Sequence, residues 1–175
     1  MKILIVGLGS IGQRHLRNLY KINSNFKFIA VRKMFTTPVL DNYLRVSNNK
    51  KSLKDRYKMK YYRTLKQALN EKPDFAVICT PTSLHLDQVL ECLKENINLF
   101  IEKPLANTAT KIKKLKNLLK NKNKLISMMG YQMRFNPIYI YLKKFLKNKN
   151  IGKINHIEIF HGEHLANFHK YEDYR

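Results

Sequence analysis

A short apolar run that ends in a cluster of glycines constrains this chain more than any other feature. Residues 2 to 6 read as a strand buried on both faces of a parallel sheet. Gly7, Gly9 and Gly12 follow at once, and apolar residues then recur at helical spacing from Ile11 to about Lys21. The predicted order is strand, tight turn, helix. The polar face of this helix is expected to carry Gln13, Arg14, Arg17 and Asn18.

Strand and helix patterns then alternate along the chain, which predicts an α/β fold with a doubly wound parallel sheet. Between residues 32 and 57 the pattern is poor, and we expect loop with some helix. The predicted strands are residues 2–6, 26–31, 58–62, 74–79, 98–102 and 125–129. The later helices are predicted from the cap Thr64 to 70, from the turn at 80–83 to about 96, from 108 to 120, and from Pro137 to about 149.

A change of pattern near residue 150 predicts a domain boundary. Ile154, His156, Glu158 and Phe160 alternate in polarity, as in a strand with one face in water. We therefore expect a first domain over residues 1–150 and the first strand of an incomplete second α/β domain in residues 151–175. The open edge of such a strand favours aggregation or pairing with a partner.

The strong positive charge of the chain indicates either an anionic partner, such as nucleic acid, or a lysine-rich surface exposed to solvent. The 34 Lys and Arg against 12 Asp and Glu give a net charge of +22. The lysines are spread over helix faces, so we interpret them as a solvated surface and expect no specific nucleic-acid binding.

Cys79 and Cys92 fall in different predicted elements, which predicts neither a disulfide nor a metal site and fits a cytoplasmic protein. No apolar stretch approaches the length of a membrane span.

The glycine cluster has the spacing G-x-G-x-x-G between a buried strand and a helix, the context of a dinucleotide-binding turn. Gly7 permits the turn, Gly9 lets the backbone approach a pyrophosphate, and Gly12 allows close packing of helix on strand. Ser10 and Ile11 open the helix, whose N-terminus would hold the pyrophosphate. The sequence therefore predicts a dinucleotide site that includes all five residues.

The end of the second strand carries the residues that discriminate between NAD and NADP. About twenty residues after Gly12, a site that prefers NAD normally has an acidic side chain for the ribose hydroxyls. Arg32 and Lys33 stand there instead. Cations suit a ribose 2'-phosphate, so NADP is favoured over NAD.

Four motifs in the same order resemble the Gfo/Idh/MocA (glucose-fructose oxidoreductase / inositol dehydrogenase) family. The resemblance covers essentially the whole chain and implies an NAD(P)-binding Rossmann domain. The motifs are the glycine turn with Gln13-Arg14-His15, the segment Ile78-Cys79-Thr80-Pro81-Thr82-Ser83-Leu84-His85, the triplet Glu102-Lys103-Pro104, and Gly130-Tyr131-Gln132-Met133-Arg134-Phe135-Asn136-Pro137.

The resemblance also implies roles for individual residues. Lys103 is similar to the family lysine, whose ammonium group stabilises the alkoxide that forms as hydride leaves the substrate carbon. His85 either borders the nicotinamide or caps its helix, and His15 is equally consistent with a packed structural histidine. Arg134 is expected to reach the crevice beyond the carboxyl ends of the strands, where a parallel sheet binds its ligand. Thr80, Pro81, Thr82 and Glu102 complete the residues that are expected to bind cofactor.

Family members continue into a second α/β domain that contributes an aspartate and a histidine to catalysis, and this chain is expected to be truncated before them. The implied function is the NAD(P)-binding portion of an oxidoreductase acting on the CH–OH group of a sugar, cyclitol or nucleotide sugar, inactive alone. The alternative is a non-catalytic nucleotide-binding module or partner subunit. Expected partners are the cofactor, a sugar-like substrate once a second domain is present, and a second copy or a complementing chain.

Overall fold

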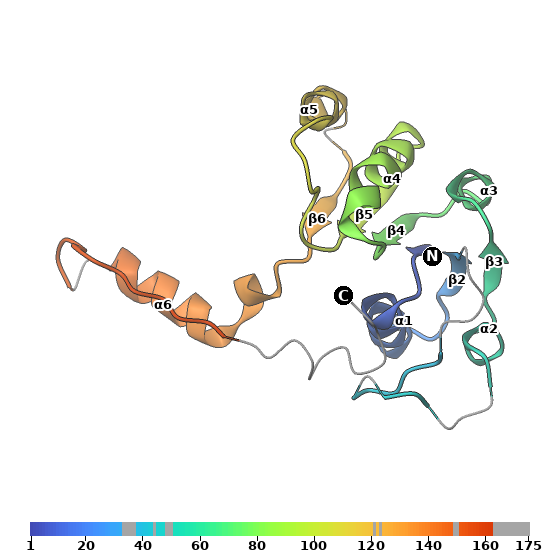
Figure 1. The fold of residues 1–175 in the computed structure, drawn as a ribbon, viewed down its shortest axis with the longest axis horizontal. Coiled ribbons are helices and arrows are strands. Elements are labelled where there is room, and N and C mark those ends of the chain that lie inside the picture. The colour runs from blue at the N-terminus through green and yellow to red at the C-terminus, as the bar shows by residue number, and fades with distance from the viewer. Residues whose placement is uncertain are drawn as a thin grey trace. The chain divides into compact units, whose positions relative to one another are not determined.

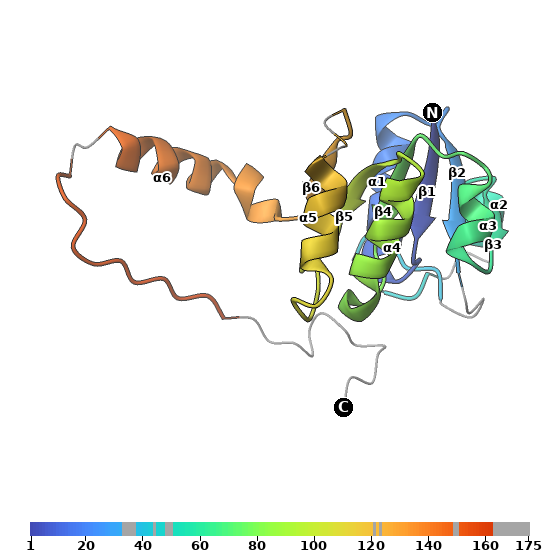
Figure 2. The ribbon, with the colours of Figure 1, turned by 90° about the horizontal axis from the view of Figure 1, so that it is seen from above.

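The computed structural model describes residues 1–32, 38–43, 45–47, 51–120, 122, 124–148 and 151–162. The chain divides into two compact units, Met1–Tyr131 and Gln132–Arg175. In the first unit helices cover both faces of a parallel sheet, as Figures 1 and 2 show. This confirms the predicted α/β class and the doubly wound sheet.

The sheet has six strands in the order β3-β2-β1-β4-β5-β6, and every neighbouring pair is parallel. Strand order reverses between β1 and β4, which makes their carboxyl ends the topological switch point, where open α/β sheets bind ligands. The strands are β1 (Lys2–Val6), β2 (Lys27–Val31), β3 (Lys60–Tyr62), β4 (Phe75–Ile78), β5 (Asn98–Ile101) and β6 (Ser127–Met129).

The helices of the first unit form where the sequence predicts them, with ends that differ by a few residues. Thr64 caps α3 through a capping box with Gln67, as its position suggested. The short α2 lies in the segment expected to be loop with some helix. The helices are α1 (Ser10–Ile22), α2 (Leu53–Arg56), α3 (Leu65–Leu69), α4 (Thr82–Lys94) and α5 (Ile112–Lys120).

Each face of the sheet has its own hydrophobic core, because successive side chains of a strand point to opposite faces. On β1, Leu4 and Val6 pack with α3, α4 and α5, whereas Ile3 and Ile5 pack with α1 and α2. All four side chains are completely buried. The prediction of a first strand buried on both faces is confirmed.

The buried amide of Gln13 joins α1 to the chain that follows β2. Gln13 Nε2 donates to the carbonyl oxygens of Leu8 at 3.1 Å and Pro38 at 2.9 Å, and Gln13 Oε1 accepts from Leu40 N at 2.8 Å. Arg17 Nη1 donates to Leu40 O at 3.0 Å. Gln13 and Arg17, which were expected on the polar face of the helix, are therefore buried. The loop at 38–40 covers this side of α1 and supplies the polar partners that its burial requires.

The second unit contains the 3₁₀ helix η1 (Gln132–Phe135) and the helix α6 (Pro137–Lys147), which Asn136 caps by accepting from Ile138 N. Residues 151–162 contain no strand, so the strand predicted from their alternation is wrong for this part of the chain. An alternating pattern becomes a strand only when a neighbouring strand completes its hydrogen bonds. The domain boundary near residue 150 stays a prediction. Among the described residues, no helix is long and apolar enough to cross a membrane.

We predict that Gln13→Ala lowers the free energy of unfolding by about 1 to 3 kcal/mol, because the buried Leu40 N–H and the part-buried Pro38 carbonyl lose their hydrogen bonds. Urea unfolding followed by circular dichroism measures the change. Asn18→Ala, which removes an exposed amide from the same helix, is the matched control and should change stability little. Equal effects of the two substitutions would contradict the assigned role of Gln13.

Candidate functional site

The carboxyl ends of β1, β4 and β5 bring the predicted site residues to one edge of the sheet. Parallel pairing continues into the turns that follow these strands. Cys79 N donates to Val6 O at 2.8 Å, and Glu102 N donates to Ile78 O at 2.9 Å. The glycine turn, the segment 80–82 and Lys103 therefore follow neighbouring strands at the same edge, next to the switch point.

Gly7 and Gly12 leave no room for a side chain. Gly7 has φ +93°, and a Cβ atom there would lie 2.8 Å from Cys79 O. A Cβ atom on Gly12 would lie 2.1 Å from Gly7 O. The first turn of α1 thus packs directly on the end of β1, which is the geometry that the glycine spacing predicted.

Gly9 differs from the other two glycines because its surroundings are open. No described atom beyond its chain neighbours lies within 4 Å of where a Cβ atom on Gly9 would stand. Gly9 is the N-cap of α1, whose first residues are Ser10 and Ile11; within the described chain no side chain caps this end, and its first turn has no acidic residue. A helix end with free N–H groups and an open approach suits an anion. These features fit the pyrophosphate of a dinucleotide.

The segment at 80–82 forms the entrance to α4 beside the glycine turn. Thr80 lies against Gly7, since its methyl carbon would be 3.1 Å from a Cβ atom there, and its hydroxyl group donates to Gln88 Oε1 at 2.6 Å. Pro81 is the N-cap of α4 and Thr82 its first residue. Two helix N-termini thus lie at the ends of the adjacent strands β1 and β4.

His85 is buried, with 1% of its surface exposed, and both ring nitrogens contact carbonyl oxygens of the protein. Nδ1 lies 2.8 Å from Pro104 O, and Nε2 lies 2.7 Å from Thr80 O. The ring therefore connects the turn after β4 to the turn after β5. Among the described side chains none caps α4, so the capping role of His85 is wrong, and its place beside the nicotinamide stays a prediction.

Glu102 holds the turn that carries Lys103. Its Oε1 lies 2.6 Å from His15 Nε2, and its Oε2 accepts from Lys103 N at 3.2 Å. Burial acts to raise the pKa of Glu102, but the hydrogen bond and charge of His15, together with the backbone N–H and the charge of Lys103, bring it below its ordinary value. The carboxylate is therefore the charged form that both donors favour. Sequence reasoning left His15 undecided and did not foresee this pair.

His15 itself packs edge-on against Phe100, with 4.8 Å between the ring centres. Lys103 is exposed, and its peptide bond to Pro104 is cis. Its side chain is thus accessible at the edge where the glycine turn lies. The two neighbours of Lys103, Glu102 and Pro104, are held by His15 and His85, and the catalytic role of Lys103 stays a prediction.

Arg32 follows β2 at the same edge. Its backbone N donates to Tyr62 O at 3.0 Å, and its guanidinium carbon lies 5.7 Å from the centre of the Tyr61 ring. Lys33 lies outside the described residues. Arg134 is exposed in η1, within the second unit. Its predicted reach into the crevice stays a prediction.

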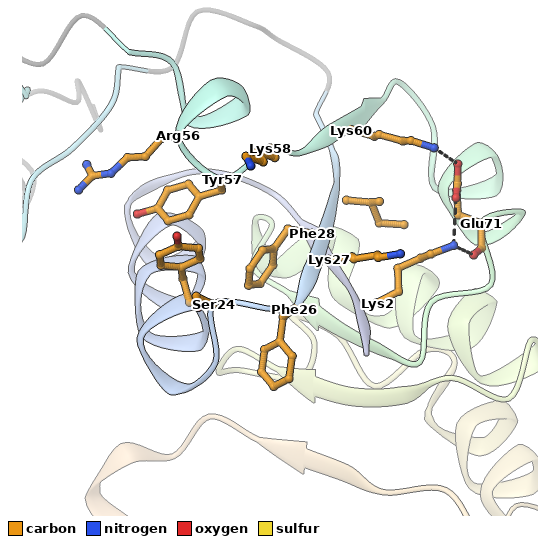
Figure 3. Close-up of a pocket in the computed structure, with 12 residues that line it drawn as sticks. Lys2, Ser24, Phe26, Lys27, Phe28, Arg56, Tyr57, Lys58, Lys60 and Glu71 are labelled. Carbon is orange, nitrogen blue, oxygen red and sulfur yellow. Dashed lines mark hydrogen bonds and ion pairs between the residues drawn. The ribbon is translucent and has the colours of Figure 1, made fainter.

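A separate pocket of about 520 Å³ lies at the amino ends of β1, β2 and β3, the opposite edge of the sheet (Figure 3). Its lysines Lys2 and Lys60 pair with Glu71 at 3.0 Å and 3.3 Å. The hydrogen bond from Tyr62, followed by those from Lys2 and Lys60, lowers the pKa of Glu71 to about 2. Because the glycine turn is at the other edge of the sheet, this pocket is not the candidate cofactor site.

Cys79 and Cys92 are buried free thiols. Burial raises the pKa of the Cys79 thiol, and it raises that of Cys92 to about 12. Both thiols are therefore protonated near neutral pH and are poor nucleophiles and metal ligands. Within the described part of the chain, no group of three or more His, Cys, Asp or Glu residues could hold a metal ion.

Residues 1–131 match the sequence model of the Gfo/Idh/MocA oxidoreductase family, described as having an NAD-binding Rossmann fold. The chain belongs to the Gfo/Idh/MocA family. The match covers the whole first unit, including the glycine turn and the turn at Lys103. The family resemblance and the Rossmann fold predicted from the motifs are confirmed.

Relatives within the Gfo/Idh/MocA family include inositol dehydrogenases. Inositol 2-dehydrogenase of Salmonella paratyphi B is 28% identical over 167 residues, which are 94% of this chain and 46% of the relative. The crystal structure of myo-inositol 2-dehydrogenase from Lactobacillus plantarum superposes with a TM-score of 0.72 at 26% identity, covering 88% of this chain and 43% of that one. Scyllo-inositol dehydrogenase from Lactobacillus casei, with bound NAD(H) and scyllo-inositol, has a TM-score of 0.70 at 22% identity, covers 88% and 43%, and shows the same fold. The chain thus spans about half the length of these relatives.

We predict that Gly9→Ala weakens cofactor binding about tenfold or more, because a methyl group would stand where the backbone approaches the pyrophosphate. Stability should change little, because the extended backbone at Gly9 suits alanine, whereas alanine is a poorer N-cap residue than glycine. Fluorescence titration with NADH and NADPH, together with urea unfolding, separates the two effects. Ser24→Ala, in the pocket at the opposite edge, is the control. Unchanged affinity in Gly9→Ala would place the cofactor elsewhere.

Proposed function

We propose that this chain binds a nicotinamide dinucleotide at the carboxyl edge of its sheet and serves the oxidation of a CH–OH group in a sugar, cyclitol or nucleotide sugar. The observation that carries the proposal is the open backbone at Gly9 on the N-terminus of α1, at the edge where Lys103 follows β5. An anion site and an accessible ammonium group at one edge are what this chemistry needs from a cofactor domain.

Lys103 is the proposed catalytic residue. A bound nicotinamide would supply the hydride acceptor. The ammonium group of Lys103 would stabilise the negative charge that develops on the substrate oxygen as its proton leaves. Its exposure and the fixed turn around it support this role.

The substrate class is inferred from relatives and from the chemistry of the site. The inositol dehydrogenases named above act on a cyclic polyol, and the chain is similar to each over 88% or more of its own length. It spans under half of their length. We therefore propose that substrate positioning needs polypeptide equivalent to the remaining part of these relatives, with a boundary near residue 150.

That polypeptide would be supplied by a complementing chain or by a longer chain of which these residues are a part. The second unit exposes apolar side chains on α6, which supports contact with further protein. The exposed set includes Ile138, Tyr139, Ile140, Tyr141 and Leu142.

We predict that the 175-residue chain binds cofactor but shows little or no turnover on sugars, cyclitols and nucleotide sugars. Loss of substrate orientation and of acid-base assistance reduces the rate by about 10⁴-fold or more. Steady-state assays of NAD(P)H formation test this, with Lys103→Ala beside Lys113→Ala, an exposed lysine on α5. Robust turnover that disappears only in Lys103→Ala would show that no further polypeptide is needed.

A further part of the proposal is that the cofactor is NADP and not NAD. Arg32 follows β2, where a 2'-phosphate would lie in this type of fold, and this supports NADP. The L. casei relative is named with NAD(H), and that observation concerns the relative alone. The guanidinium of Arg32 lies over the Tyr61 ring, and this contact supports a fixed position for it after β2.

We predict that NADPH binds more tightly than NADH, because the phosphate gains a charge-assisted hydrogen bond from Arg32. Equilibrium titration of both cofactors measures the ratio of affinities. Arg32→Asp should reverse the ratio, whereas Arg56→Asp, in the pocket at the opposite edge, should preserve it. Equal affinities in the unaltered chain, or an unchanged ratio in Arg32→Asp, would remove the proposal.

The second candidate function is a nucleotide-binding module without catalysis. It is supported by one observation, that residues 1–131 contain the open N-terminus of α1 by themselves, so that anion binding needs no residue of a substrate domain. Adding the remaining part of a relative as a separate polypeptide distinguishes the two. Turnover that appears on mixing supports the enzyme, and cofactor binding without turnover on any partner supports the module.

A further inference from the structure

We propose that His15 and His85 are positioning residues that hold the Lys103 turn from opposite faces of the sheet. This inference rests on the proposed function for the importance of Lys103, but its structural basis is independent of it. The two histidines contact the two residues that flank Lys103 in sequence, Glu102 and Pro104.

The two contacts come from helices on different layers. His15 belongs to α1, which packs on one face of the sheet, and it contacts the carboxylate of Glu102 at 2.6 Å. His85 belongs to α4, which packs on the other face, and it contacts the carbonyl oxygen of Pro104 at 2.8 Å. Lys103 therefore lies between two anchor points, one from each layer.

Each histidine is itself fixed. His85 is almost completely buried, and its second nitrogen contacts Thr80 O at 2.7 Å. His15 packs edge-on against Phe100, the residue two positions before Glu102. The Glu102 carboxylate also accepts a hydrogen bond from Lys103 N. One carboxylate therefore links His15 to the backbone of Lys103.

The two histidine contacts, which we call the clamp, also connect the Lys103 turn to the glycine turn at residues 7–12. His15 is on the helix that begins at Gly9, and His85 contacts Thr80, which lies against Gly7. The position of the lysine backbone relative to the glycine turn is thus set by a few short hydrogen-bond contacts. Catalysis by an ammonium group depends on such positioning, because a small displacement lowers the rate steeply.

The two histidines contact the turn through different ring nitrogens, which gives a sharp test. Asparagine places its amide nitrogen near the position of Nδ1, and glutamine places it near Nε2. At position 85 the Pro104 contact uses Nδ1, so His85→Asn should retain it and His85→Gln should lose it. At position 15 the Glu102 contact uses Nε2, so the order is reversed.

The readout is the backbone amide signal of Lys103 in ¹H–¹⁵N spectra of the 175-residue chain. We expect His85→Gln and His15→Asn to shift this signal, and His85→Asn and His15→Gln to leave it near its original position. The same two substitutions at His156, in the second unit, are the matched control and should not move it. A role in packing alone would not produce opposite preferences at the two positions.

A pattern in which asparagine and glutamine act alike at both positions would overturn the proposal. If the buried position 85 does not tolerate substitution, the His15 pair decides alone. Titration of each variant with cofactor separates this inference from the proposed function. Variants that still bind cofactor but show a smaller shift of the Lys103 amide signal on binding support the clamp. If the unaltered chain binds no cofactor, the proposed function is rejected, and the amide pattern of the variants remains the test of the clamp.

Discussion

The packing of Gly12 against Gly7 is the constraint on which the rest of the site depends. A single Cβ atom at Gly12 would approach Gly7 O to 2.1 Å, so the first turn of α1 can lie on the end of β1 only with glycine there. This approach fixes the direction of α1 and leaves its N-terminus at the switch point of the sheet. It also brings His15, one turn further along α1, within reach of Glu102. The candidate anion site and the turn that carries Lys103 thus depend on the same contact.

The sheet supplies the second level of organisation. Its parallel order places the ends of β1, β4 and β5 side by side, and its two cores hold α1 and α4 on opposite faces. Polar contacts then cross between turns that are far apart in sequence. His85 joins residues 80 and 104, and Gln13 joins α1 to the loop at 38–40. Burial makes these contacts costly to lose, which favours a single arrangement of the edge.

Local patterns in the sequence were sufficient to predict the six strands of the sheet, most helices and the edge at which the candidate site residues gather. Apolar runs such as residues 74–79 and caps such as Thr64 report on short segments, so they can be read directly. The partners of Gln13, Arg17 and the two histidines could not be predicted in this way. Each partner is far away in the sequence and meets the helix only in the folded chain. The alternation at 153–161 misled for the same reason, since a strand needs a neighbour outside its own pattern.

The central claim is that a nicotinamide dinucleotide binds at the carboxyl edge of the sheet, on the glycine turn. The most direct measurement is a map of backbone amide shifts in the ¹H–¹⁵N spectrum of the chain as NADPH or NADH is added. The account predicts that the largest changes fall at residues 7–12, at 80–82 and at Lys103. Changes concentrated at Lys2, Lys27 and Lys60, at the opposite edge, or spread evenly over the surface lysines would contradict it.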